Sequence, residues 1–197
     1  MNSLKNNLFK KGTTVFVLVV FNFLLLHCSQ EPSSGNGTTN IPPPQNDSII
    51  VLDSIKDLEI PFFSPQEEIV RHTTYTLSYS EPHEQAKWVA YKLTASMIIG
   101  LTKRKNDFRA DPLVKTGSAE KDDYVQSGFD RGHLCPAADR KFSEDEMSET
   151  FFMSNMIPQK PYFNRGIWKK LEEQVRYWAT KNEELFVVTG GVLENNF

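Results

Sequence analysis

The sequence has almost no cysteine, and this scarcity limits both the redox chemistry and the metal chemistry that it can support. Its two cysteines are Cys28, which ends an apolar run near the N-terminus, and Cys135 in the folded part. Cys135 therefore has no disulfide partner there, and the fold must depend on its hydrophobic core. The sequence also has no His-Glu-x-x-His motif and no cluster of Cys and His, which argues against a zinc hydrolase.

An excess of positive charge is missing as well. The chain has 22 Lys and Arg against 25 Asp and Glu, which gives a formal net charge of −3. This balance argues against a protein that binds nucleic acid mainly through bulk electrostatic attraction. A local phosphate site is still open, and the basic segment 103–109 with its one phenylalanine is a candidate for it. The alternative interpretation of this segment is a solvated loop.

Long hydrophobic runs are absent except for one near the N-terminus. Lys5, Lys10 and Lys11 precede an apolar stretch over 15–26, which is shorter than the roughly 20 residues that span a bilayer. This order is typical of a signal peptide. The stretch ends at Cys28 and resembles a bacterial lipoprotein signal, which implies a lipid on Cys28 that anchors an exported protein facing the periplasm or the cell exterior. Ordinary cleavage nearby would instead leave a free thiol.

Composition divides the chain into three parts. The lipoprotein-type signal segment covers 1–28, and a flexible linker rich in Ser, Gly, Asn, Thr and Pro covers 29–47. The remaining part, 48–197, has about 150 residues, which is enough for one domain with its own core. Because the sequence stops soon after the Gly-Gly pair at 190–191, we expect this domain to be truncated at its C-terminus.

Hydrophobic patterning predicts several strands. Alternation over 74–79 and 87–94 indicates two strands, which the loop 80–85 would join as a hairpin at the edge of a sheet. The polar segment 102–129 is expected to be irregular, and loops of this length are often functional. The continuous apolar run 185–189 predicts a buried strand.

Two helices are also predicted. Ser143 and Glu146 form a capping-box pattern before a helix over 144–152. The segment 154–157 is expected to be a brief extended stretch. A second, clearly amphipathic helix begins at about Asn164, and its apolar residues recur at helical spacing, which predicts one buried stripe. The stripe consists of Ile167, Trp168, Leu171, Val175 and Trp178.

The run Asp-Arg-Gly-His at 130–133 concentrates the residue types that phosphodiester chemistry needs. An imidazole such as that of His133, with an ordinary pKa near 6.5, accepts a proton at physiological pH. Downstream, Asn164 offers an amide oxygen, which is a ligand that magnesium accepts. Asp130 and Arg131 are expected to brace the histidine loop, with Arg131 in reach of a backbone phosphate. Taken alone, His133 could be structural and Asn164 a simple helix N-cap.

The segment 127–140, Ser-Gly-Phe-Asp-Arg-Gly-His-Leu-Cys-Pro-Ala-Ala-Asp-Arg, resembles the signature of the DNA/RNA non-specific endonuclease family, the ββα-metal or His-Me finger nucleases. The resemblance covers roughly Tyr75 to the end of the sequence. It implies an α+β fold, with a central antiparallel sheet, a ββα-metal nuclease site and flanking helices. The other matching segments are 154–159, 164–168, 171–172 and 187–190.

The same resemblance implies a role for each site residue. His133 would be the general base, and Asn164 the direct protein ligand of a catalytic magnesium, with manganese as the alternative. Glu172 would hold the metal through water, Arg176 would act in the catalytic site, and Asn155 would shape it. Read without the family, Glu172 and Arg176 would be an ion pair on a helix surface, and Asn155 would satisfy loop backbone.

A second arginine is implied to contact the scissile phosphate. Arg104 and Arg109 are both candidates, and their spacing does not choose between them. Cys135 is expected to be a packed small hydrophobe. His72 and His83 have no neighbouring ligand pattern, and we expect them to be surface residues.

These observations predict an exported, magnesium-dependent endonuclease that hydrolyses phosphodiester bonds in DNA and RNA with little sequence specificity. The family resemblance implies products with a 5′-phosphate and a 3′-hydroxyl. The expected partners are the nucleic-acid substrate and, through the lipid on Cys28, a membrane; no protein partner is predicted. The alternative is a catalytically inactive, surface-anchored nucleic-acid-binding lipoprotein on the same fold, which would tolerate the loss of His133.

Overall fold

The computed structural model describes residues 19–21, 57–182 and 184–193. Cys28 and the predicted linker therefore lie outside the described residues, and both stay predictions. Within the described part, no helix is long and apolar enough to cross a membrane.

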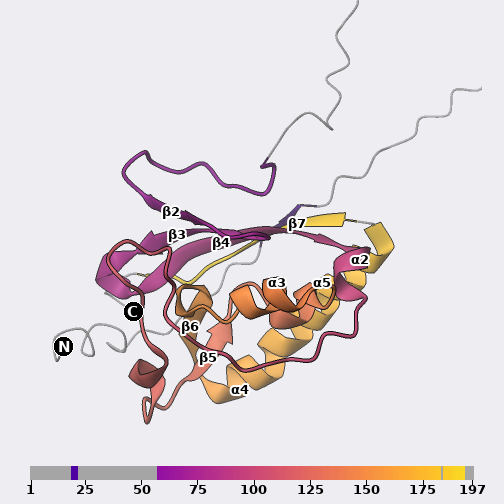
Figure 1. The fold of residues 1–197 in the computed structure, drawn as a ribbon. Coiled ribbons are helices and arrows are strands. Elements are labelled where there is room, and N and C mark those ends of the chain that lie inside the picture. The colour runs from indigo at the N-terminus through magenta and orange to yellow at the C-terminus, as the bar shows by residue number, and fades with distance from the viewer. Residues whose placement is uncertain (1–18, 22–56, 183, 194–197) are drawn as a thin grey trace, which may run out of the picture. The chain divides into compact units, whose positions relative to one another are not determined.

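A five-stranded antiparallel sheet forms one layer of the domain, in the order β1-β7-β4-β3-β2 (Figure 1). A separate two-stranded antiparallel sheet pairs β5 with β6. The strands are β1 Val19–Phe21, β2 Glu68–Arg71, β3 Thr76–Ser80, β4 Gln85–Thr94, β5 Asp130–His133, β6 Met156–Gln159 and β7 Glu184–Thr189.

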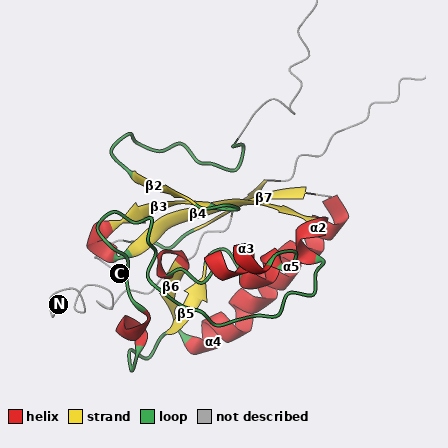
Figure 2. Cartoon of the chain, in the orientation of Figure 1, coloured by secondary structure: helices red, strands yellow, loops and turns green. Residues whose placement is uncertain are grey.

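The helices lie together on one face of the larger sheet, with the β5–β6 pair beside them (Figures 1 and 2). The α-helices are α2 Ala95–Ile98, α3 Glu144–Glu149, α4 Pro161–Phe163 and α5 Lys169–Asn182, and a π-helical turn, Asn164–Trp168, connects the last two. The 3-10 turns are Glu81–His83, Lys121–Tyr124, Ala137–Arg140 and Met153–Asn155. The architecture is α+β, as the sequence predicts.

The core fills the space between the sheet and α5. Alternate residues of the central strands, including Leu77, Val89 and Leu93, are fully buried. Val175 and Ala179 lie one turn apart on α5 and join the same cluster, because residues at i and i+4 share one face of a helix. Apolar burial of this kind is the main stabilising term in a domain without disulfides.

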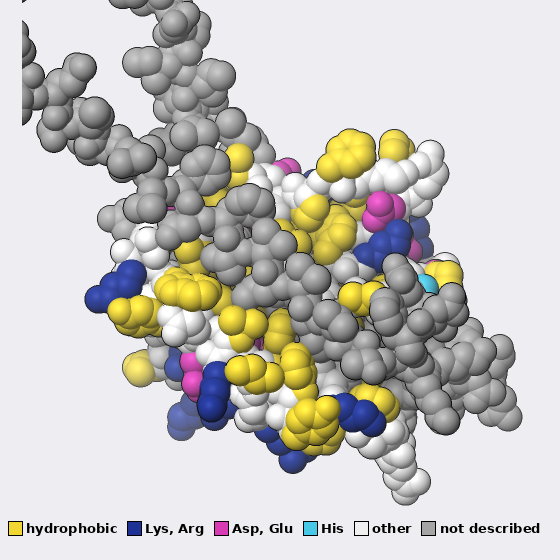
Figure 3. All heavy atoms as spheres, turned by 180° about the vertical axis from the view of Figure 1, so that it is seen from behind, with side chains coloured by type: hydrophobic (Ala, Val, Ile, Leu, Met, Phe, Trp, Pro, Cys, Tyr) yellow, Lys and Arg dark blue, Asp and Glu magenta, His cyan; other side chains and the backbone are white. Residues whose placement is uncertain are grey.

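The surface of the domain mixes charge and apolar groups. On the face in Figure 3, Lys and Arg side chains lie between hydrophobic ones, and acidic side chains are close by. This mixture agrees with a net charge of −3 and gives no face of one sign in the described part of that view.

The predicted hairpin forms, but its predicted place in the sheet is wrong. β3 and β4 pair as expected, with Leu77 opposite Val89. β2 covers the outer side of β3 and β7 lies on the other side of β4, so the hairpin is inside the sheet. The sequence of β2, Glu-Ile-Val-Arg, is too short for alternation to identify a strand.

The two predicted helices both form, with different boundaries. Ser143 caps α3 and accepts a hydrogen bond from the Glu146 N–H (3.4 Å), although the helix ends at Glu149 rather than residue 152. The second helix begins at Pro161, so Asn164 is not its N-cap. Proline suits the first helical position because it has no N–H to leave unpaired.

The π-helical turn also changes which residues are buried. Trp168 is only 4% exposed, whereas Ile167, predicted to lie in the buried stripe, is 62% exposed. A π turn closes i to i+5 bonds and so accommodates an extra residue, which breaks the 3.6-residue spacing on which the stripe was predicted. π turns of this kind occur frequently at functional sites.

Candidate active site

Strand β5 is fastened to the helix that follows β6 by the carboxylate of Asp130. Asn164 donates its Nδ2 to Asp130 Oδ2 (3.0 Å), and Arg165 donates Nε and Nη2 to the two carboxylate oxygens (2.8 and 2.7 Å). The hydrogen bonds from Arg165 are the main cause that lowers the pKa of Asp130. Asp130 thus braces this loop as the sequence predicts, and it orients the Asn164 amide.

The other end of β5 is held by two hydrogen bonds, one to the carbonyl of its last residue and one to the carbonyl of the residue that follows. Trp168 donates its indole Nε1 to the carbonyl of His133 (3.2 Å), and Thr189 of β7 donates its hydroxyl to the carbonyl of Leu134 (3.0 Å). One helical turn therefore holds both the first and the last residue of the strand.

Asn155 supports the chain just after His133. Its side-chain oxygen accepts from the Cys135 N–H (2.8 Å), and its Nδ2 donates to the carbonyls of Cys135 (3.0 Å) and Thr150 (2.8 Å). Asn155 is fully buried, so it acts on the site through the backbone. Cys135 is also buried and is the packed hydrophobe that the sequence predicts.

The imidazole of His133 is buried between two aromatic rings. Phe151 meets it edge-on with 5.0 Å between centroids, and Phe108 lies tilted at 5.9 Å. Burial, together with the charges of Arg104 and Arg131, lowers the pKa of His133 to about 3. Its Nε2 is buried without a hydrogen-bond partner among the described residues. The ring is neutral at physiological pH and has a nitrogen that can accept a proton.

The two candidate arginines have different surroundings. Arg104 is exposed, lies over the Phe151 ring (4.8 Å to the centroid) and influences the pKa of His133. Arg109 is bound to Asp107 and to the carbonyl of Ser148, and it stacks on Phe152. Arg104 is therefore the one that the fold brings to His133.

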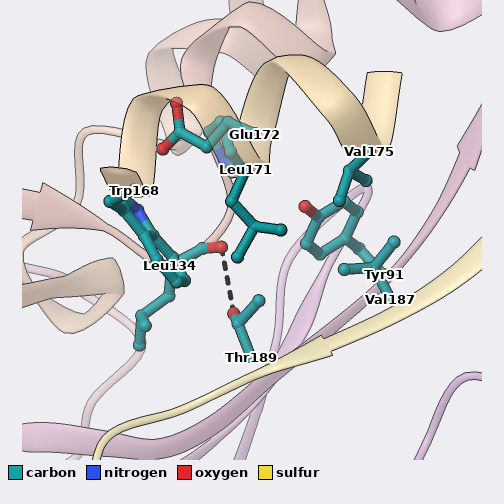
Figure 4. Close-up of a pocket in the computed structure, with 9 residues that line it drawn as sticks. Tyr91, Leu134, Trp168, Leu171, Glu172, Val175, Val187 and Thr189 are labelled. Atoms are coloured by element: carbon teal, nitrogen blue, oxygen red, sulfur yellow. Dashed lines mark hydrogen bonds between the residues drawn. The ribbon is translucent and has the colours of Figure 1, made fainter. Parts of the chain in front are cut away.

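Glu172 and Arg176, one turn apart on α5, sit next to a buried carboxylate. Arg176 donates a hydrogen bond to Asp139 Oδ1 (2.9 Å), and the Tyr91 hydroxyl donates one to Asp139 Oδ2 (3.1 Å). Burial, with the charge of Asp139, raises the pKa of Glu172 to about 7. Figure 4 shows the Glu172 carboxylate turned away from Leu171, which points from α5 into a small cavity.

A divalent cation with few protein ligands fits these residues. Because Asn164 commits its Nδ2 to Asp130, its Oδ1 is the atom left for a ligand. Among the described residues, no group of three or more His, Cys, Asp or Glu could enclose a metal. This donor set suits magnesium, which keeps several waters and binds few protein oxygens, better than zinc.

One residue of the site was missed in the sequence. Gln159 is 1% exposed, and neither its Nε2 nor its Oε1 has a partner among the described residues. Its side chain lies diagonally across the β5–β6 pair against Gly132, where an added Cβ would lie 2.1 Å from the Gln159 Cδ. This close approach explains the glycine before the histidine, and only the pairing of the two strands reveals it.

His72, predicted to be a surface residue, is instead buried. Its Nε2 lies 2.9 Å from Asp111 Oδ2, and its ring stacks on Tyr75 and Phe152. The carboxylate that it contacts is distant in the sequence, so no local pattern indicates this burial. His83, with Nδ1 bonded to the Ser80 hydroxyl (2.8 Å), is partly exposed.

The lowered pKa of His133 predicts a pH-dependent stability. Between the ordinary pKa near 6.5 and the folded value of about 3, protonation favours the unfolded chain. As pH falls below about 6.5, wild type should therefore lose stability relative to His133→Gln, by at most about 1.4 kcal/mol per pH unit. Urea unfolding of both proteins with chelator present measures this. Parallel stability curves from pH 7 to pH 4 would contradict it.

Comparison with known proteins identifies the fold and the sequence pattern. The model of the DNA/RNA non-specific endonuclease family matches residues 59–196. The mitochondrial nuclease EXOG of Danio rerio is 39% identical over 125 residues, which cover 62% of this chain and 36% of that protein. A nuclease of Nostoc sp. is 36% identical over 129 residues, covering 64% of this chain and 47% of that protein. The chain thus spans less than half the length of these two relatives.

A solved structure has a similar fold. A chain in the crystal structure of the EndoG/EndoGI complex, which concerns the mechanism of EndoG inhibition, superposes with a TM-score of 0.58 at 32% identity. The match covers 62% of this chain and 52% of that one. The family model covers more than half of this chain, and the chain belongs to the DNA/RNA non-specific endonuclease family.

Proposed function

We propose that this domain is an endonuclease that uses magnesium, or manganese as the alternative, to hydrolyse phosphodiester bonds in DNA and RNA. The observation that carries the proposal is that hydrogen bonds from the π-helical turn hold both ends of β5. Asp130 accepts a hydrogen bond from Asn164, and the His133 carbonyl accepts one from Trp168, so one helical turn is bonded to both ends of the strand that carries the proposed base. Membership of the nuclease family supports the same activity.

His133 is the general base of the proposed reaction. Its neutral imidazole accepts a proton from the attacking water, whose oxygen forms the new bond to phosphorus. The bond from phosphorus to the 3′ oxygen then breaks, and that oxygen takes up a proton from a water molecule. The imidazolium of His133 then returns its proton to solvent, so that the base is neutral again. The products carry a 5′-phosphate and a 3′-hydroxyl. A phosphate beside Arg104 and Arg131 offsets their charge, which raises the pKa of His133 towards the range in which a base works efficiently.

Asn164 and Glu172 are the proposed holders of the cation, Asn164 through its Oδ1 and Glu172 through a water. A cation bound there supplies positive charge that stabilises the phosphoryl oxygens. Asp130 orients Asn164 for this task because it accepts the amide hydrogen and leaves the oxygen free to bind. The buried Asp139–Arg176 pair lies beside Glu172, and its arginine balances the local negative charge.

Arg104 is the proposed arginine at the scissile phosphate, and Arg109 has a structural role. Contacts from arginine to phosphate carry no sequence information, which agrees with cleavage of little sequence specificity. The 2′-hydroxyl is not needed in the proposed reaction, so both DNA and RNA fit.

The activity is tested by the nicking of supercoiled plasmid. We expect cleavage with magnesium, none with chelator, and a loss of about 10²- to 10⁴-fold in His133→Ala, because the general base is removed. His83→Ala is the matched control, since this histidine lies in a separate 3-10 turn and should leave the rate unchanged. Plasmid binding without cleavage by the folded wild type would instead support the inactive nucleic-acid-binding protein.

We further propose that the protein is exported and anchored by a lipid on Cys28. The apolar stretch and the cysteine that ends it support this proposal. Within that stretch, β1 pairs with β7, so cleavage before Cys28 would remove β1 and leave β7 at the edge of the sheet.

Labelled palmitate tests the anchor in bacterial cells that express the full chain. We expect label in wild type and its loss in Cys28→Ser, together with release from the membrane fraction. Cys135→Ser is the matched control and should keep the label, because that thiol is buried. Equal labelling of wild type and Cys28→Ser would exclude Cys28 as the lipid site.

A further inference from the structure

A cleft of about 490 Å³ opens beside Asn164. It is lined by the 3-10 turn that contains Lys121 and by Val125, Phe129, Arg131 and Asn164. Its volume is in the range of small-molecule sites, about 300–1,000 Å³. We call it the side cleft. Because Asn164 is in its wall, a strand whose phosphate lies at the catalytic residues must pass this cleft with its next nucleotide.

The charges in the side cleft favour a phosphate. Arg104, Lys121 and Arg131 all line it. The carboxylate in its wall belongs to Asp130 and is already offset by two hydrogen bonds from Arg165. The cleft is therefore positive although the chain as a whole has a net charge of −3.

The rest of the lining is apolar and aromatic, which a phosphate alone does not need. Phe108, Tyr124 and Phe129 contribute rings, and Val125 is 61% exposed. Tyr124 is only 6% exposed, while the Arg131 guanidinium lies over the Phe108 ring (4.4 Å to the centroid) and the Lys160 ammonium over the Phe129 ring (4.1 Å). Phe108 separates the cleft from the catalytic histidine, with its ring 5.9 Å from that of His133. Nucleobases stack on arginine guanidinium planes as well as on aromatic faces, so the Arg131 guanidinium on Phe108 offers a stacking surface for any base.

Side chains that could read the identity of a base are scarce in the side cleft. Asn106 and Asn164 are the amides in its lining. Asn106 accepts a hydrogen bond from Arg104 Nε (2.9 Å), and Asn164 donates to Asp130. A base that enters would be held by its face and its phosphate, without a strong preference for one base.

We propose that the side cleft takes the nucleotide next to the scissile phosphate with its base unpaired, so that the enzyme binds single-stranded nucleic acid in preference to continuous duplex. A base packed against these side chains has left its stack and its partner, and a strand without a partner avoids the cost of opening the pair. This inference rests on the proposed nuclease function, because that function places the scissile phosphate at His133 and Asn164.

Fluorescence anisotropy of the full-length His133→Ala protein with magnesium tests the inference without cleavage. The probes are labelled octathymidylate, an abasic sugar-phosphate chain of the same length, and a duplex of similar length. We expect octathymidylate to bind about tenfold more tightly than either other probe, as stacking of one base predicts. Val125→Asp, which places a carboxylate in the cleft, should abolish the difference between octathymidylate and the abasic chain.

A charge-reversal variant distinguishes binding in the side cleft from attraction by the overall charge of the protein. Added to His133→Ala, Lys121→Glu should weaken octathymidylate binding about tenfold and reduce the dependence of affinity on salt. Lys115→Glu is the matched control, with the same change of charge at an exposed lysine outside the lining. It should leave the affinity within about twofold. Both lysines are exposed, and thermal melting verifies that the variants fold.

Three results would overturn the inference. Equal affinity for octathymidylate and the abasic chain would mean that the cleft binds phosphate only. Equal weakening by Lys115→Glu and Lys121→Glu would mean that bulk charge governs binding, and tighter binding of duplex would contradict the strand preference. Failure of the nuclease function is seen separately, as octathymidylate binding with the expected discrimination while the wild-type protein does not nick plasmid.

Discussion

The site depends on the hydrogen bonds that the carboxylate of Asp130 accepts from the helix after β6. This carboxylate receives charge-assisted hydrogen bonds from Arg165 and a further one from Asn164, and bonds to charged groups are about twice as strong as neutral ones. Together with the bond from Trp168 to the His133 carbonyl, it makes β5 and the helix one unit. The π-helical turn is the segment that places these three helix residues against a single short strand.

Two ionisable side chains of the candidate site have pKa values that are shifted in opposite directions. Burial and two nearby arginines lower the pKa of His133, while burial and the charge of Asp139 raise the pKa of Glu172. A phosphate would offset the arginines, and a cation would offset the carboxylates. The phosphate and the cation of the proposed function would thus relieve opposite electrostatic costs, the first at His133 and the second at Glu172.

The sequence predicted what local patterns and family motifs determine. It predicted the β3–β4 pair, the amphipathic helix and the run that ends in His133, because alternation, helical spacing and a motif are properties of nearby residues. It could not predict contacts made across the fold. The packing of the Gln159 side chain against Gly132 and the burial of His72 on Asp111 depend on strand pairing and on long loops. The choice of Arg104 over its alternative required the same information.

The central claim is that His133 and Asn164 act as one catalytic unit. The most direct measurement is the cleavage rate of a chromogenic phosphodiester by His133→Ala, by Asn164→Ala and by the double variant, all with magnesium. Groups that act together show strongly non-additive losses. The account predicts that the double variant is about as slow as the slower single variant. Losses that multiply, or a single variant as fast as wild type, would contradict it.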